Sequence, residues 1–94
     1  MNAVIIFDVS DRRVEIIESM KNLGYSITWI NPGTNILYNL PSNVVWKPNA
    51  ELNTALNELK NVISILHRAD SPIELLRCII LNSTPWDGIG GTQL

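Results

Sequence analysis

The sequence predicts one two-layer α+β domain with the order strand, helix, strand, strand, helix, strand. The chain opens with a short β-branched apolar run at residues 4–9, and a second apolar run at 75–82 closes it. Two stretches with helical spacing of apolar residues lie between them. A chain of 94 residues fits one hydrophobic core. We therefore expect residues 1–84 to form a single domain, with both helices on one face of an antiparallel sheet, and residues 85–94 to form a turn-rich tail.

The first strand and helix follow from the run at residues 4–9. A continuous apolar run of this length is typical of a central strand that is buried on both faces. Ser10 is a favoured N-cap residue, and Asp11 suits the first turn of a helix. Gly24 stands where a left-handed residue would end that helix. The apolar stripe of the helix consists of Val14, Ile16, Ile17, Met20 and Leu23.

The middle of the chain predicts two or three short strands, and it leaves the position of the hairpin open. Residues 25–30 alternate between side chains for the two faces of a strand and include β-forming residue types. Residues 35–40 and 44–47 are also candidates for strands. The hairpin could turn at Pro32–Gly33 or at Pro41–Ser42. We favour the first turn, with residues 44–47 extending the sheet.

The second helix begins near Asn49, the expected N-cap, and continues to about residue 66. Asparagines recur every four residues along it, and we expect that column to face solvent. The segment 71–74 resembles a capping box, which would start a third helix at residues 72–78. Residues 75–82 instead have the pattern of a buried strand, and the two-layer arrangement needs one more strand. We therefore expect a closing strand there.

Composition limits the function. The net charge of −2 disfavours a broad basic surface that would hold phosphates by charge alone. The single cysteine, Cys78, excludes an internal disulfide framework and fits a reducing, cytoplasmic environment. No secretory signal or apolar run long enough to span a membrane is visible, so we expect no membrane partner. His67 has no neighbouring ligand at metal-binding spacing, and a structural role is expected for it and for Cys78.

Asp8 is the best single candidate for chemistry. A carboxylate at the end of a central strand can bind Mg²⁺ when a second carboxylate joins it, from Asp11 or from Asp8 of a second subunit. The competing interpretation is a hydrogen bond to the backbone of the following turn, and we favour this structural role. Arg12 and Arg13 could bind nucleic-acid phosphates at the start of the helix, or they could pair with nearby acids such as Glu15.

Three tryptophans, Trp29, Trp46 and Trp86, are candidates for an interface. Aromatic rings stack on nucleic-acid bases, but they are more common in cores and in subunit contacts. We favour the core or contact role.

The segment Val4-Ile5-Ile6-Phe7-Asp8-Val9-Ser10-Asp11-Arg12-Arg13 resembles the first strand and helix start of the CRISPR-associated protein 2 superfamily, which includes virulence-associated protein D. The resemblance covers about a quarter of the chain. It implies a ferredoxin-like βαββαβ homodimer with an added C-terminal strand. It also implies that Asp8 corresponds to the aspartate that, in members with nuclease activity, pairs across the dimer to hold a divalent metal. The basic and aromatic pattern of the second strand in such nucleases is missing from residues 25–31.

These observations lead to three functional hypotheses. The first is a small dimeric binding or regulatory protein, which by the resemblance could belong to a bacterial or mobile-element defence or toxin–antitoxin system and would need no cofactor. The second is a metal-dependent endonuclease for RNA or DNA that uses Asp8 and Mg²⁺. The third is an inhibitor that binds a partner protein. The sequence does not decide whether the protein is an enzyme.

Overall fold

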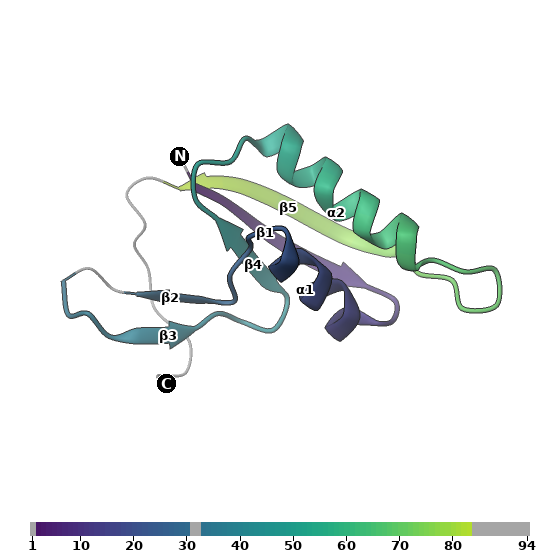
Figure 1. Cartoon of the computed structure of the whole chain (residues 1–94), viewed down its shortest axis with the longest axis horizontal. Coiled ribbons are helices and arrows are strands. Elements are labelled where there is room, and N and C mark those ends of the chain that lie inside the picture. The colour runs from purple at the N-terminus through teal and green to yellow at the C-terminus, as the bar shows by residue number, and fades with distance from the viewer. Residues whose placement is uncertain (1, 31–32, 84–94) are drawn as a thin grey trace.

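A three-stranded antiparallel sheet forms the centre of the protein in a computed structural model that describes residues 2–30 and 33–83. Its strand order is β4-β1-β5, with β1 (Asn2–Val9) between β4 (Val44–Lys47) and β5 (Leu75–Ser83) (Figure 1). Ile5 in β1 stands opposite Val45 in β4 and Ile80 in β5. The expected central position is thus confirmed, but burial on both faces is incomplete, because Ile6 and Asp8 are partly exposed.

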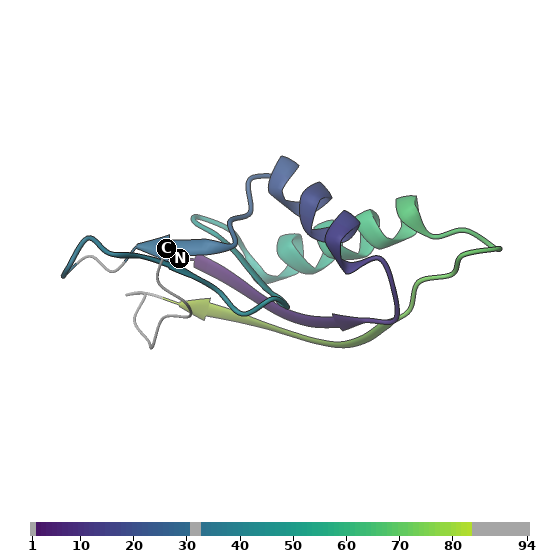
Figure 2. The same ribbon diagram turned by 90° about the horizontal axis from the view of Figure 1, so that it is seen from below.

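Both helices, α1 (Arg13–Asn22) and α2 (Leu52–Leu66), cover the same face of this sheet (Figure 2). Alternate residues of β1 point towards them, as the period of a strand requires. These side chains meet the apolar stripes of both helices in one core. The buried core residues are Ala3, Ile5, Phe7, Ile16, Met20, Tyr25, Val45, Ala55, Leu59, Val62, Ile63 and Ile73. The described residues therefore form a mixed α/β fold with two helices and an antiparallel sheet.

The N-cap of α1 is Arg12, which corrects the expected N-cap at Ser10. The hydroxyl of Ser10 accepts a hydrogen bond from the backbone N–H of Glu74 at 2.8 Å. The backbone N–H of Ser10 donates in turn to the carbonyl oxygen of Glu74 at 3.0 Å. A contact with the residue that precedes β5 (Leu75–Ser83) thus replaces the local cap. Gly24 has a φ of +98° just after α1 ends, as expected of a left-handed residue there.

The N-cap of α2 is Glu51, so the expected N-cap at Asn49 is wrong. Asn49 has a φ of +54° and lies in the turn that leads to the helix. Asparagine is among the few residues that enter this left-handed region readily. The asparagine column is exposed, as expected; its members are Asn49, Asn53, Asn57 and Asn61.

The hairpin consists of β2 (Thr28–Ile30) and β3 (Leu37–Asn39), which pair as a separate two-stranded sheet. Ile30 pairs with Leu37, so the hairpin turns between these residues and not at Pro41–Ser42; Pro32 of the preferred turn lies outside the described residues. Both strands are shorter than expected, and the hairpin projects away from the larger sheet (Figure 1). An isolated bridge connects the two sheets, because Ser26 and Trp46 exchange backbone hydrogen bonds of 2.8 and 3.1 Å.

Residues 75–83 form β5, which confirms the expected closing strand and excludes a helix at 72–78. A β-bulge displaces the pairing between Asp8 and Val9, and the regular ladder of β5 then runs from Arg77 to Ser83. The expected tail, including Trp86, falls outside the described residues. Neither α1 nor α2 has the length and apolar character that a membrane-crossing helix requires.

Candidate functional site

Asp8 lies near the end of β1, directly opposite Arg77 on β5. A carboxylate oxygen of Asp8 is 2.7 Å from Nη2 of Arg77, and the Asp8 side chain is one-third exposed. The expected hydrogen bond to the following turn is thus replaced by an ion pair across the sheet. Exposed pairs of this kind contribute about 0–1 kcal/mol to stability.

No group of three potential metal-ligating side chains (His, Cys, Asp or Glu) occurs in the described ranges 2–30 and 33–83. The other carboxylate of this junction, Asp11, accepts a hydrogen bond from the backbone N–H of Arg12 at 2.8 Å. A metal ion at Asp8 would have to compete with the guanidinium of Arg77. The metal-binding role of Asp8 therefore stays a prediction that depends on ligands from a second subunit.

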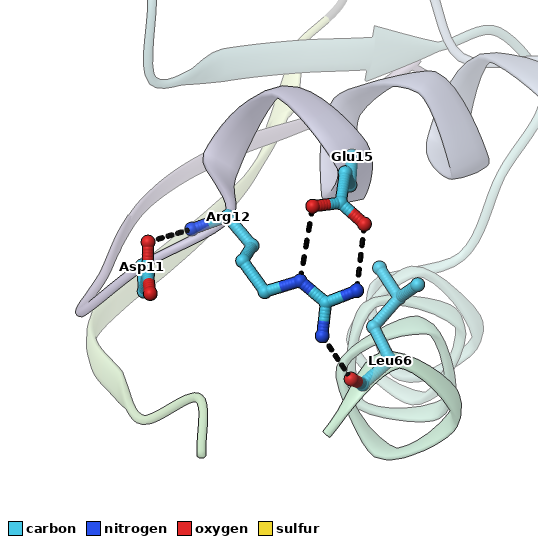
Figure 3. A network of polar contacts seen from close by, with 4 residues as sticks. All are labelled: Asp11, Arg12, Glu15 and Leu66. Carbon is cyan, nitrogen blue, oxygen red and sulfur yellow. Dashed lines mark hydrogen bonds and ion pairs between the residues drawn. The ribbon is translucent and has the colours of Figure 1, made fainter. Parts of the chain in front are cut away.

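Arg12 connects the start of α1 to the end of α2 (Figure 3). Its Nε and Nη2 donate to the two carboxylate oxygens of Glu15 at 3.0 and 2.6 Å. Its Nη1 donates to the carbonyl oxygen of Leu66 at 2.5 Å, at the C-terminal end of α2 where carbonyl groups lack helical partners. The hydrogen bonds between Arg12 and Glu15 raise the pKa of Arg12 and lower the pKa of Glu15. The guanidinium of Arg12 thus has a structural role, because it connects α1 to the end of α2.

Arg13 differs from its neighbour. Its side chain is exposed, and no ion pair among the described residues includes it. Of the two arginines that sequence indicated for phosphate contacts, Arg13 is the one without such an ion pair.

Two of the three tryptophans meet at the hairpin. Trp29 on β2 is buried, and its ring stacks on Tyr38 of β3 with centroids 5.5 Å apart. Nε1 of Trp46 donates to the carbonyl oxygen of Thr28 at 2.6 Å, which connects β4 to the hairpin. A pocket of about 270 Å³ opens here. Its lining consists of Ser26, Thr28, Trp29, Ile30, Leu37 and Trp46.

An exposed apolar pair lies at the edge of this pocket. Ile30 and Leu37 stand opposite each other in the hairpin, and their exposed fractions are 56% and 36%. Sequence reasoning missed both residues. The signal that could have indicated them is the charge pattern, because the stretch 22–46 contains no Asp, Glu, Lys, Arg or His. We call Ile30, Leu37, Trp29, Trp46 and Tyr38 the hairpin surface.

The remaining candidates have structural roles. The Nδ1 atom of His67 lies 3.0 Å from the backbone nitrogen of Ile73, so the ring joins the end of α2 to the segment before β5. Cys78 is partly buried beside the core, and desolvation raises the pKa of its thiol, which disfavours the reactive thiolate. Comparison with models of protein families gives no match, and comparisons with curated proteins and with solved structures give none either.

Proposed function

We propose that this chain is a small dimeric binding protein that regulates a partner protein by contacting it through the hairpin surface. The observation that supports the proposal most is an exposed apolar pair, Ile30 and Leu37, in a stretch without a single charged residue. Depletion of charge with aromatic residues present is the compositional pattern of the centre of protein interfaces. The absence of positive charge there also disfavours nucleic acid as the ligand of this surface.

Contacts within the hairpin and to β4 support the hairpin surface. Stacking of Trp29 on Tyr38 and the hydrogen bond from Trp46 to Thr28 hold the base of the pocket in one arrangement. A preformed surface loses less conformational entropy when a partner binds. Full burial of an exposed apolar side chain contributes about 1.5–3 kcal/mol. From their exposed fractions, Ile30 and Leu37 together would contribute about 2 kcal/mol, or roughly 30-fold in affinity.

The endonuclease hypothesis has less support. The Asp8 carboxylate is paired with Arg77, and the Arg12 guanidinium is paired with Glu15. Both groups would have to give up these contacts to serve a metal ion or a phosphate, whereas the hairpin surface requires no such rearrangement.

The finer fold assignment is also a proposal. We infer a ferredoxin-like arrangement in which β5, β1, β4 and the segment around Ser26 lie in that order and β3 is an addition. The exchange of hydrogen bonds between Ser26 and Trp46 supports it, because Ser26 belongs to the segment between α1 and β2 and forms an isolated bridge to β4. The resemblance of the first strand to the CRISPR-associated protein 2 superfamily supports the same order. A role in a bacterial or mobile-element defence or toxin–antitoxin system rests on that resemblance.

Affinity capture from the native host tests the hairpin surface. The bait proteins are the tagged wild type, the double variant Ile30→Asp/Leu37→Asp and a control, Ile65→Asp. Ile65 suits the control because it is 81% exposed on α2, at the end remote from the hairpin. We expect a stoichiometric partner that the wild type and the control retain and that the double variant loses at least 30-fold, by the estimate above.

Equal retention by all three proteins, or no retained partner, would contradict the proposal. If the partner is an enzyme, its activity with and without the wild-type protein would separate an inhibitor from a binding protein without effect on activity.

A further inference from the structure

The larger sheet has one open edge among the described residues. At its other side, β4 is bridged to the hairpin through Ser26 and Trp46. Within residues 2–30 and 33–83, β5 pairs with β1 alone, and its outer edge runs from Leu75 to Ser83. An apolar edge strand of this length offers unpaired N–H and C=O groups to another strand.

The composition of β5 suits it to pairing. Arg77 is the only charged residue in the strand, and it is already neutralised by Asp8. Apolar side chains on β5 remain exposed, with fractions of 56% for Leu76, 57% for Ile79 and 49% for Leu81. Among the described residues the outer edge of β5 is unpaired, and an apolar edge of this kind pairs readily with another strand.

The hydrogen bonds of β1 indicate which groups of β5 point outwards. The backbone N–H of Phe7 donates to Asn43 on the β4 side, so odd-numbered residues of β1 bond towards β4. In an antiparallel ladder, the alternate residues then bond to β5. The even-numbered residues of β1, among them Ile6 and Asp8, stand opposite odd-numbered residues of β5. The N–H and C=O groups of Cys78, Ile80 and Asn82 therefore point to the open edge.

We propose that two copies of this chain pair through their β5 edges, antiparallel and centred on Ile80, so that two three-stranded sheets become one sheet of six strands. This inference specifies how the two copies in the proposed dimer contact each other, and it rests on that proposed dimer. The regular part of β5 runs from Arg77 to Ser83, and Ile80 is its midpoint. With the two-fold axis at Ile80, every residue of this regular part would stand opposite a residue of the second copy. In the described part of the chain, the larger sheet of each copy has one open edge, and a two-fold pairing closes it in a dimer.

The charges favour a second copy as the occupant. With Ile80 at the two-fold axis, Ile79 stands opposite Leu81 of the second copy, and Arg77 stands opposite Ser83. The two Arg77 residues are then six positions apart along the ladder, or about 20 Å. That separation exceeds the screening length of about 8–10 Å at ordinary ionic strength, so the pairing brings apolar groups together without charge repulsion.

Disulfide trapping at the two-fold axis tests this arrangement. The background is the full chain with Cys78→Ser, which removes the native thiol. A cysteine at position 80 would face its own copy at about 5.5 Å between Cα atoms, within the range that a disulfide tolerates. The matched control is Asn82→Cys, which belongs to the same outward row but would face residue 78 of the second copy. We expect Ile80→Cys to become a disulfide-linked dimer under mild oxidation and Asn82→Cys to remain unlinked.

Light scattering under reducing conditions separates the outcomes. A dimer in which position 80 does not link, or links no better than position 82, would overturn the β5 pairing and leave the dimer standing. A strict monomer would overturn both, while the hairpin surface would remain to be judged by the capture experiment.

A second pair of variants avoids any dependence on the folding of the cysteine proteins. Ile79→Lys changes an exposed residue of β5, and Val14→Lys changes one that is 73% exposed on α1. We expect Ile79→Lys to weaken dimerisation at least tenfold and Val14→Lys to leave it unchanged. Equal dissociation constants for the two variants would overturn the inference.

Discussion

Tyr25→Phe would remove one hydrogen bond at a junction of three elements. The Tyr25 hydroxyl donates to Oε1 of Glu58 on α2 at 3.1 Å. Nζ of Lys47 on β4 is 3.5 Å from Oε2 of the same carboxylate and 5.2 Å from the centre of the Tyr25 ring. The segment after α1 is thereby connected to β4 and to α2, so the substitution tests how much this polar junction contributes to stability.

The expected loss at neutral pH follows from the type of bond. A hydrogen bond to a charged group contributes about 1.5–3 kcal/mol. The Glu58 side chain is 20% exposed and keeps Lys47 as a partner after the substitution, so we expect the lower end, about 1.5 kcal/mol. For a domain of this size, that corresponds to a fall in Tm of about 6–12 °C. Urea unfolding of the wild type and of Tyr25→Phe measures it.

The same substitution should change the alkaline behaviour. Burial raises the pKa of Tyr25 above its ordinary value of 10.0, and the hydrogen bond to Glu58 and its negative charge raise it further. Above about pH 10, tyrosine in the unfolded chain loses its proton before Tyr25 in the folded protein does. The unfolded state then binds fewer protons, so the free energy of unfolding falls as pH rises past 10.

Tyr25→Phe should lack this contribution, so the difference between the two proteins should shrink between about pH 8 and about pH 11. The matched control is Tyr38→Phe, which leaves the Glu58 junction intact. An identical alkaline loss of stability in the wild type and in Tyr25→Phe would refute the reasoning.

Two further predictions concern the backbone and the alternative function. Gly24→Ala should cost about 1–2 kcal/mol in urea unfolding, because an L-residue is strained at a φ of +98°. An added Cβ would meet Lys47 Cε at an ordinary 3.5 Å, so a loss below about 0.5 kcal/mol would contradict backbone strain as the cause. If the protein is an endonuclease, RNA or DNA should be cleaved with Mg²⁺ by the wild type and by the exposed control Asp70→Ala, but not by Asp8→Ala. No cleavage by the wild type, or equal cleavage by Asp8→Ala, would end that hypothesis.

Local periodicity predicted the main elements because each has a long apolar pattern. The continuous run of β1, the stripe of α2 and the closing run of β5 all form where the sequence indicates them. The end of α1 at Gly24 was predictable for the same reason, since a positive φ favours glycine strongly.

The helix starts were predicted wrongly because capping residues have alternative partners. Ser10 is a suitable N-cap, but its hydroxyl binds the backbone of Glu74, which lies far away in sequence. Asn49 is also suitable, and it takes a left-handed conformation in the preceding turn. Short polar side chains hydrogen-bond to whichever backbone group the fold brings near them, so local preference did not decide.

The sequence by itself determined the two helices, the first and last strands and the residue types available for chemistry, but it left open whether two or three strands lie between the helices, where the structure has three among the described residues. Only the tertiary structure decided which of those residues meet. It brought Arg77 to Asp8, which changes an acid that is a candidate metal ligand into half of an ion pair. It placed Ile30 and Leu37 side by side at the pocket that Trp29 and Trp46 also line, and it left β5 at an edge that is open among the described residues. Pairings of this kind join residues far apart in sequence, and no local pattern encodes them because they depend on the packing of the whole core.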